Sequence, residues 1–517
     1  MPCFLPNCRK PFFTLRRIFM NMTCMKTYSY LLAVAIILST AVSCKKSNTQ
    51  AAPTAPVGGG TDTSAAAKTG LLLDSLYLYS KEVYLWHEVI PSYAIFNPRQ
   101  YTGATDLAAA QNEMAGIRAL QPQDKKHSYS FVTTTAGSAA IQTGDSKDYG
   151  FFIKSASLDK ALPYDSVYWF VEYVYKASPA GTAGVQRGWY ISKINNNAIG
   201  YDNASVAILN DVFFGSGTAA SFTFTKADGS TVSLDLAKGS FTANSVLYTD
   251  VITDGTRKTG YLVFNQFFGQ TSITELTNAF TDFASKNINE LVIDLRYNHG
   301  GSTATQDALA NLIVPSAATG KTMYTYIFND SLTAGKFPLL KRKPGFGNVS
   351  FAPAINTVNY QKSGSITSLN RVFFIVSSET ASASELLINN LRPYMDVKLV
   401  GDTTYGKPVG FFPIAIYDYA IYPISFKTVN SAGSAEYYDG FVPDKLTPDG
   451  VNRNWGDLNE PSLAAALRYI STGTFGRISA TADEENRRQL SIQKQFEPLN
   501  SKLYENKFTG MFVNRQR

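Results

Sequence analysis

The sequence predicts a multidomain α/β protein, and three observations support that fold class. At 517 residues the chain exceeds one ordinary domain, and its 44% content of hydrophobic residues is ample for more than one core. Short apolar runs rich in β-formers at 291–295 and 371–376 predict buried strands. Apolar residues at helical spacing over 384–391 follow the second run, and another strand pattern follows at 396–400. Strands that alternate with helices in this order are typical of an α/β domain.

Other elements can be read on either side of this unit. Apolar positions at helical spacing over 71–89 and 106–120 predict a small helical N-terminal region, placed at 69–140. A buried strand is predicted at 260–264. The C-terminal tail, 471–517, is polar and mixed in charge, so it predicts either a docking helix or disorder.

The segment Thr380-Ala-Ser382-Ala-Ser384-Glu385 lies where the strand at 371–376 turns into a helix. Amides at the start of a helix are unpaired and favour a negative oxygen nearby. A serine there can attack a carbonyl carbon while neighbouring amides hold the resulting oxyanion. Ser382 and Glu385 also fit the spacing of a capping box, in which case the segment would only begin a helix.

Lys407 follows Ser382 by 25 residues, in a Gly406-Lys407-Pro408 loop after the strand at 396–400. A strand–turn–helix–strand unit can bring that loop back beside the serine. A lysine acts as a general base only when neutral, so burial must lower its pKa towards about 7–8. The alternative is a solvated surface lysine, but the flanking glycine and proline favour a constrained loop.

A glycine pair, Gly300-Gly301, follows the predicted strand at 291–295. Paired glycines let a backbone amide approach a substrate closely, although an ordinary turn has the same composition. The chain therefore offers a nucleophile, an amine base and amide donors for an oxyanion, which is the chemistry of acyl transfer.

Together these segments resemble those of the C-terminal processing peptidases, the tail-specific proteases of peptidase family S41. The resemblance implies that Ser382 is the nucleophile and Lys407 the general base. It also implies that the backbone amides of Ala383 and Gly301 form the oxyanion hole, with His299 standing where the family often has proline.

The same resemblance implies a ClpP/crotonase-like α/β peptidase core over 241–470, because 440–444 and 457–467 are similar to the family's closing strand and helix. One position departs from the pattern. Family members often carry a glutamine four residues after the lysine, where this chain has Phe411. Either another polar group orients Lys407, or this branch does without one.

Rival chemistries can be weighed by counting residues. The chain has three histidines and four cysteines, and all the cysteines lie near the N-terminus: Cys3, Cys8, Cys24 and Cys44. These cysteines and histidines are too few for a Cys/His zinc site or a Cys/His enzyme, so we expect no metal and no cofactor. A Ser-His-Asp triad would need His299 or His127 as its base, and we expect His127 to have no catalytic role.

Residues 146–240 resemble a PDZ domain. The segment Tyr149-Gly150-Phe151-Phe152 is similar to its carboxylate-binding loop and the strand after it, and Ser178 begins an S-P-A-x-x-A-G-like motif. Such domains bind a peptide's C-terminus by strand addition while loop amides hold the carboxylate. The alternative is a β-rich spacer with a closed groove.

The N-terminus predicts export. Residues 1–24 are interpreted as an extended leader or a mis-assigned start, and 25–43 as a lipoprotein-type signal peptide, too short to span a membrane as a helix. Small residues before Cys44 resemble a bacterial lipobox, so Cys44 is the predicted lipidation site, followed by a flexible tether at 44–68. The net charge of +7 falls to +2 when the five basic residues of 1–43 are removed. The remaining charge does not predict nucleic-acid binding.

These observations predict a serine endopeptidase that binds protein or peptide substrates with free C-termini. It would be anchored by lipid in the cell envelope, at the outer membrane facing the periplasm, because Lys45-Lys46-Ser47-Asn48 lacks an acidic run. The alternatives are a non-catalytic protein of the same fold that binds a ligand, and a PDZ scaffold lipoprotein that only recruits partners. The sequence does not indicate an oligomeric state.

Overall fold

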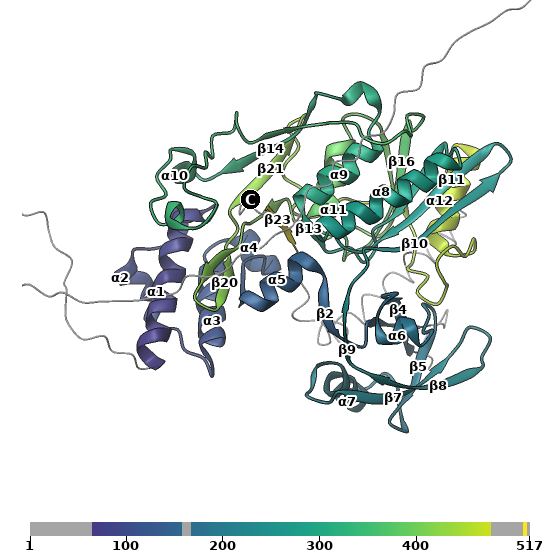
Figure 1. Cartoon of the computed structure of the whole chain (residues 1–517), viewed down its shortest axis with the longest axis horizontal. Coiled ribbons are helices and arrows are strands. Elements are labelled where there is room, and N and C mark those ends of the chain that lie inside the picture. Colours follow the sequence, from purple (N-terminus) through teal and green to yellow (C-terminus); the bar gives the residue numbers. More distant parts are fainter. Residues whose placement is uncertain (1–64, 158–166, 477–486, 488–509, 514–517) are drawn as a thin grey trace, which may run out of the picture. The chain divides into compact units, whose positions relative to one another are not determined.

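Figure 1 shows the computed structural model of the chain, which describes residues 65–157, 167–476, 487 and 510–513. The predicted leader, the signal peptide, Cys44 and the tether up to residue 64 lie outside the described residues. None of the helices in the described part is long and apolar enough to cross a membrane.

The described chain begins with the predicted helical region. Helix α1 spans Ala65–Val83 and α3 spans Asp106–Arg118, with the short helices α2 (Tyr93–Phe96) and α4 (Pro122–His127) beside them. Thr105 caps α3 by accepting a hydrogen bond from the Ala108 N–H at 3.1 Å. Buried residues of α1 and α3 belong to the same hydrophobic core as the central sheet. The helices are therefore part of the main core.

The region is not purely helical. Strand β1 (Phe131–Thr134) follows α4 and pairs antiparallel with β20 (Tyr419–Tyr422), which in turn pairs with β19 (Ile414–Ile416). Helix α5 (Thr135–Thr143) comes next, with Thr134 as its N-cap. This pairing brings residues near 130 against the segment just after Lys407.

A separate sheet with its own hydrophobic core follows in the chain. Its main strand order is β3-β4-β5-β7-β8, with bounds Phe151–Ser157, Val167–Val174, Tyr190–Ile194, Ala219–Thr225 and Thr231–Ala237. Strand β6 (Asn197–Ala198) pairs with β5, and the helices are α6 (Pro179–Thr182) and α7 (Asn203–Phe214). Strands β2 (Asp145–Asp148) and β9 (Gly239–Thr242) pair at the entry and exit of this sheet unit.

The central sheet has the order β10-β11-β12-β16-β17-β22. The bounds are Val246–Asp254, Arg257–Phe264, Glu290–Asp294, Arg371–Val376, Asp396–Gly401 and Lys445–Leu446. Strand β10 pairs antiparallel with β11, and the remaining pairs are parallel. Parallel strands place their carboxyl ends at one edge, which is where the turns after β12 and β16 meet.

Side chains of the central strands alternate between two cores. Ile293 and Phe374 face the main core with helices α8 (Gln270–Ser285), α9 (Thr303–Ile313) and α11 (Ala383–Leu391). Val292 and Phe373 face a second core that is closed by helix α12 (Pro461–Thr472). This period of two is what a strand buried on both faces requires, and it explains the continuous apolar runs in the sequence.

A smaller sheet has the order β15-β14-β21-β18, with bounds Thr357–Asn359, Thr322–Phe328, Phe426–Asn430 and Val409–Gly410. Helix α10 spans Asp330–Thr333. Strand β13 (Gly300–Ser302) pairs in parallel with β23 (Gly510–Phe512), which comes from the C-terminal tail. The tail thus contributes a buried strand where the sequence suggested a docking helix or disorder.

The structure confirms the multidomain α/β class and several predicted elements. Strand β16 has the predicted bounds, β17 ends one residue later than predicted, and β12 begins and ends one residue earlier than predicted. Helix α1 begins at Ala65, within the stretch interpreted as a tether, and ends at Val83 before the predicted 89. The sequence around Trp86 is apolar but forms a turn and a 3-10 helix, His87–Val89.

Candidate active site

Ser382 lies in the turn between β16 and α11 with a strained backbone. Its φ of 61° and ψ of −107° fall in a region that residues with a Cβ rarely adopt. The turn is fixed to the end of the neighbouring strand β12, because Thr380 Oγ1 donates to Leu295 O at 2.8 Å and Ser377 Oγ donates to Arg296 O. The surrounding structure therefore holds the serine in a conformation that it would not take alone.

Glu385 connects Ser382 to Lys407. Its Oε2 accepts the backbone N–H of Ser382 at 2.9 Å and that of Lys407 at 2.8 Å. Its Oε1 accepts the Gly406 N–H at 2.7 Å and the Thr404 hydroxyl at 2.6 Å. One buried carboxylate thus binds both segments that carry the predicted nucleophile and base.

The capping-box interpretation is half right. Glu385 reaches back to the Ser382 N–H as such a box requires. The Ser382 side chain, however, makes no capping hydrogen bond, and its Oγ is buried with no hydrogen-bond partner among the described residues. The hydroxyl is consequently not used to begin the helix.

Lys407 is fully buried, contrary to the usual fate of a lysine. Its Nζ lies 4.8 Å from the ring centroid of Tyr129 and 4.8 Å from that of Phe411. Burial lowers the pKa of Lys407 to about 7, against the opposing attraction of the Asp124 and Glu385 carboxylates. Phe411, which stands where the family often has glutamine, supplies an apolar wall beside the amine.

Tyr129 and Asp124 were missed by sequence reasoning. The Tyr129 hydroxyl donates to Gly406 O, so this residue holds the lysine loop as well as covering the amine. Asp124 is buried and accepts hydrogen bonds from the Tyr84 hydroxyl at 2.8 Å and the Ser130 N–H at 2.9 Å. The polar segment at 124–130 is visible in the sequence, but nothing in it connects Tyr129 or Asp124 with Lys407.

The Gly300-Gly301 turn lies against the serine turn. Ala381 N donates to Asn298 O at 3.0 Å, and Gly300 N donates to the Asn298 side chain at 2.9 Å. Gly301 has a φ of 134°, and a Cβ there would lie 2.1 Å from Phe267 O, so only glycine fits.

The predicted oxyanion donors are the backbone N–H groups of Gly301 and Ala383, and the structure indicates which way each one points. Phe267 N donates to Gly300 O at 2.9 Å, and Ser302 N donates to Phe267 O at 2.7 Å. Because successive residues of a strand point their N–H groups to opposite sides, the Gly301 N–H faces β23. Ala383 is the first residue of α11, so its N–H has no acceptor within the helix. A Cβ on Gly300 would lie 3.0 Å from Ala383 N, which places the two turns in contact.

The two histidines considered as rival bases, His299 and His127, contact Glu379 and Tyr129 respectively. His299 Nε2 is 3.2 Å from Glu379 Oε2, in the turn before Ser382. The His127 ring stacks on Tyr129, with centroids 5.1 Å apart. The backbone of Ser382 is tied to that of Lys407 through Glu385.

The predicted peptide-binding loop begins the edge strand β3. Tyr149 and Phe151 are buried in the core of the separate sheet, and the Phe152 ring stacks on Tyr173. Gly150 has a φ of 78°, and its N–H donates to Asp148 Oδ1 at 2.6 Å. The amide predicted to bind a peptide carboxylate therefore already has a carboxylate partner within the chain.

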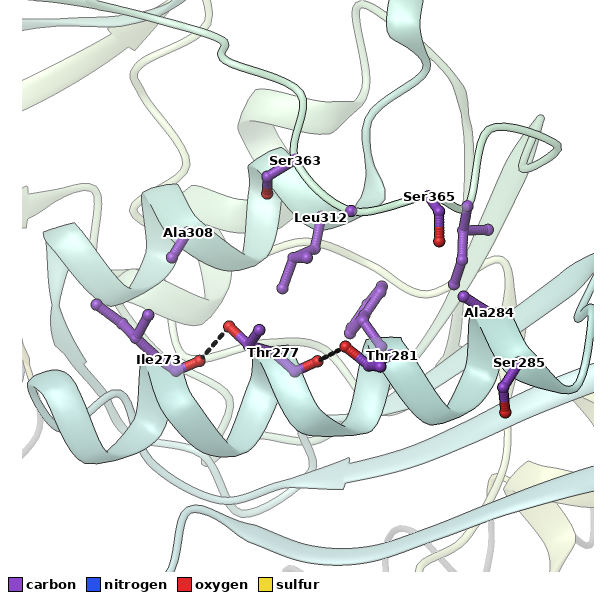
Figure 2. A pocket seen from close by; sticks show the side chains of 12 residues that line it. Ile273, Thr277, Thr281, Ala284, Ser285, Ala308, Leu312, Ser363 and Ser365 are labelled. Carbon is purple, nitrogen blue, oxygen red and sulfur yellow. Dashed lines mark hydrogen bonds between the residues drawn. The ribbon is translucent and has the colours of Figure 1, made fainter. Parts of the chain in front are cut away.

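A groove on the surface lies apart from these residues. Figure 2 shows that its walls come from α8, α9 and the segment 363–366. Thr277 and Thr281 donate their hydroxyls to helix carbonyls at 2.7 and 2.8 Å, as the dashed lines in Figure 2 indicate. Its lining contains no charged residue, so it offers no acid, base or metal ligand.

A buried serine, a lysine held in an apolar cage and two converging turns define a site of the serine hydrolase type. Residues 258–444 match the sequence model of peptidase family S41. This match supports a peptidase function. No curated protein sequence matches the chain.

One of three solved structures reported for comparison has a TM-score above 0.5 and shows the same fold. A putative S41 protease from Bacteroides fragilis NCTC 9343 is 21% identical, covers 77% of this chain and 97% of its own, and has a TM-score of 0.57. The photosystem II D1 C-terminal processing protease is 18% identical over 76% of this chain and 99% of its own, with a TM-score of 0.44. Mature CPAF complexed with lactacystin is 11% identical over 83% and 99%, with a TM-score of 0.43.

Proposed function

We propose that the chain is a serine endopeptidase that uses Ser382 as nucleophile and Lys407 as general base. The observation that carries the proposal is the buried Glu385 carboxylate, which binds the backbone N–H groups of both residues. A lysine whose pKa is near 7 is half neutral at neutral pH and can accept a proton.

The reaction follows from these roles. Lys407 Nζ takes the proton from Ser382 Oγ as the oxygen attacks the scissile carbonyl carbon of a polypeptide. The amides of Gly301 and Ala383 donate to the oxyanion that forms. The protonated lysine then gives its proton to the leaving amine, and water hydrolyses the acyl-enzyme by the same base.

Substrate recognition is proposed to use the edge strand β3. In the described sheet β3 pairs only with β4, so its other edge can accept a peptide as an added strand. The ring of Phe213 on α7 contacts Phe151 at a centroid distance of 5.2 Å and supplies an apolar wall. A free C-terminal carboxylate would have to compete with Asp148 for the Gly150 N–H.

The proposed setting is the cell envelope, with a lipid on Cys44 and the protein facing the periplasm. Replacing Cys44 by serine should release the protein from the membrane fraction. A wild-type protein that is already soluble in the periplasm would contradict lipidation.

Cleavage of unstructured casein by the wild type and by Ser382→Ala tests the enzyme proposal. We expect the wild type to cleave and the variant to lose activity by at least about a thousandfold. Equal cleavage by both proteins, or cleavage by neither, would favour the non-catalytic alternative, a ligand-binding or scaffold protein of this fold.

A further inference from the structure

The candidate active site is closed in this structure. Ser382 and Lys407 each have 0% of their surface exposed. The Ser382 Oγ is buried with no hydrogen-bond partner within the described part of the chain. A protein substrate cannot contact this hydroxyl unless part of the surrounding structure moves.

The segment that covers the site is the strand β23 from the C-terminal tail. It pairs in parallel with β13, with Gly510 opposite Gly300 and Met511 opposite Gly301. Gly510 N donates to His299 O at 3.0 Å. On its other side, Phe411 N donates to Met511 O at 3.1 Å and Val513 N donates to Phe411 O at 3.2 Å. The segment therefore lies as an extended strand between the predicted oxyanion turn and the lysine loop.

Gly510 lies against the groups proposed for catalysis. A Cβ on Gly510 would come within 3.1 Å of Lys407 Nζ and 2.6 Å of the Phe411 ring. A Cβ on Gly300 would come within 2.5 Å of Gly510 O and 3.0 Å of Ala383 N. The Gly510 carbonyl oxygen and the Ala383 nitrogen thus both lie against Gly300, the residue before the predicted donor Gly301.

The next two side chains are anchored in apolar surroundings. Met511 and Phe512 are buried and belong to the main hydrophobic core. A Cβ on Gly410 would lie 2.7 Å from Met511 Cγ, so glycine at 410 makes room for this side chain. Main-chain pairing on both sides with pockets for side chains is how extended peptides are bound by strand addition.

We propose that Gly510–Phe512 occupies the substrate cleft as a built-in peptide, and that the cleft selects extended polypeptides with a small residue followed by large apolar ones. This inference rests on the proposed function and adds its substrate class and its regulation. The tail is intramolecular and so competes with any substrate at a high effective concentration. Catalysis then requires the tail to leave β13.

The test uses the full chain with Ser382→Ala, so that binding is measured without cleavage. Gly510→Val places a branched side chain against Phe411 and Lys407 and should displace the tail. Gly217→Val is the matched control, because a Cβ at Gly217 meets nothing within 4 Å. The probe is a fluorescein-labelled peptide with the sequence of residues 508–513, and fluorescence anisotropy reports its binding.

We expect the peptide to bind Gly510→Val at least about tenfold more tightly than Gly217→Val, because a vacated cleft removes the competing state. Equal affinity for the two folded variants would overturn the proposal. Gly510→Ala is a milder second variant, and the same tightening is expected. If both substitutions at 510 prevent folding, the tail is a structural part of the core and the proposal is wrong.

A parallel measurement separates this inference from the proposed function. With Ser382 intact, casein hydrolysis should rise about tenfold in Gly510→Val relative to Gly217→Val. Tight peptide binding by Gly510→Val without casein hydrolysis by either protein would support the tail's occupancy and count against the peptidase. Hydrolysis that is equal in both variants would support the peptidase and count against the tail as an inhibitor.

Discussion

Two lysines of this chain, Lys407 fully buried and Lys154 with 18% of its side chain exposed, have opposite environments. Lys407 lies between the rings of Tyr129 and Phe411, and burial lowers its pKa to about 7. For Lys154 on β3 burial also favours the neutral form, but Glu379 at 2.8 Å, Asp449 at 3.6 Å and Glu172 at 3.9 Å reverse the effect and raise its pKa. The difference teaches that contacts with carboxylates decide whether a buried amine is a base or a fixed cation.

The two positions are also connected. Lys154 pairs with Glu379 Oε1, and Glu379 Oε2 lies 3.2 Å from His299 in the turn before the glycine pair. Lys154 thus joins the edge strand of the separate sheet to both turns of the candidate active site, while Lys407 lies within that site.

Lys407→Arg should have the largest effect. Arginine cannot become neutral at ordinary pH, so we expect casein hydrolysis to fall about a thousandfold. Lys362→Arg is the matched control, because burial lowers the pKa of Lys362 to about 8 at a place apart from Ser382. An active Lys407→Arg, together with an inactive His299→Ala, would replace the lysine by a histidine base.

Lys154→Met should act on stability instead. It removes the cation that Glu379 and Glu172 share, although Asp449 keeps Arg187 and Arg296 at 3.2 Å each. We expect the free energy of unfolding to fall by about 3 kcal/mol, measured by urea denaturation. Lys286→Met is the control, since the exposed pair of Lys286 with Asp282 at 2.9 Å contributes less than about 1 kcal/mol. Equal losses in the two variants would contradict the distinction between the two lysine environments.

The pH dependence should follow Lys407 alone. The neutral amine is the active form, so kcat/KM should rise about tenfold per pH unit below pH 7 and level off above it. The raised pKa of Lys154 keeps it charged throughout this range. A rate that falls as pH increases through 7 would show that the essential group acts in its protonated form.

Tyr129→Phe should have the smallest effect of these changes. The ring remains against Lys407, so the midpoint of the pH profile should not move. The hydrogen bond to Gly406 O is lost, and we expect kcat to fall severalfold, equivalent to about 1 kcal/mol. A shifted midpoint would indicate that the hydroxyl itself sets the pKa of the lysine.

The sequence predicted the local parts of this site and missed the distant ones. Ser382 and Gly301 could be proposed as site residues because a strand, a turn and a helix start are each encoded by a few consecutive residues. Tyr129 was missed because its contact with the Lys407 loop spans 277 residues of sequence. Local spacing holds no information about such a pairing.

The strand at Gly510–Phe512 was missed for a different reason. It is three residues long, and its extended form is imposed by β13 and Phe411, not by its own propensity. The capping interpretation of Ser382 was also only partly right, because the motif fixes the spacing of Glu385 but not the strained φ of the serine. Fold class follows from periodicity, whereas the closure of the site follows from tertiary contacts.

The Glu385 carboxylate has a consequence for how the site opens. It accepts the backbone N–H groups of Ser382, Gly406 and Lys407, so none of the three can exchange its proton with solvent while the carboxylate stays in place. In deuterated buffer these amides should exchange together, at one rate, as a single cooperative unit. The proposed nucleophile and base would then lose and regain their ordered positions together during any local unfolding of the chain.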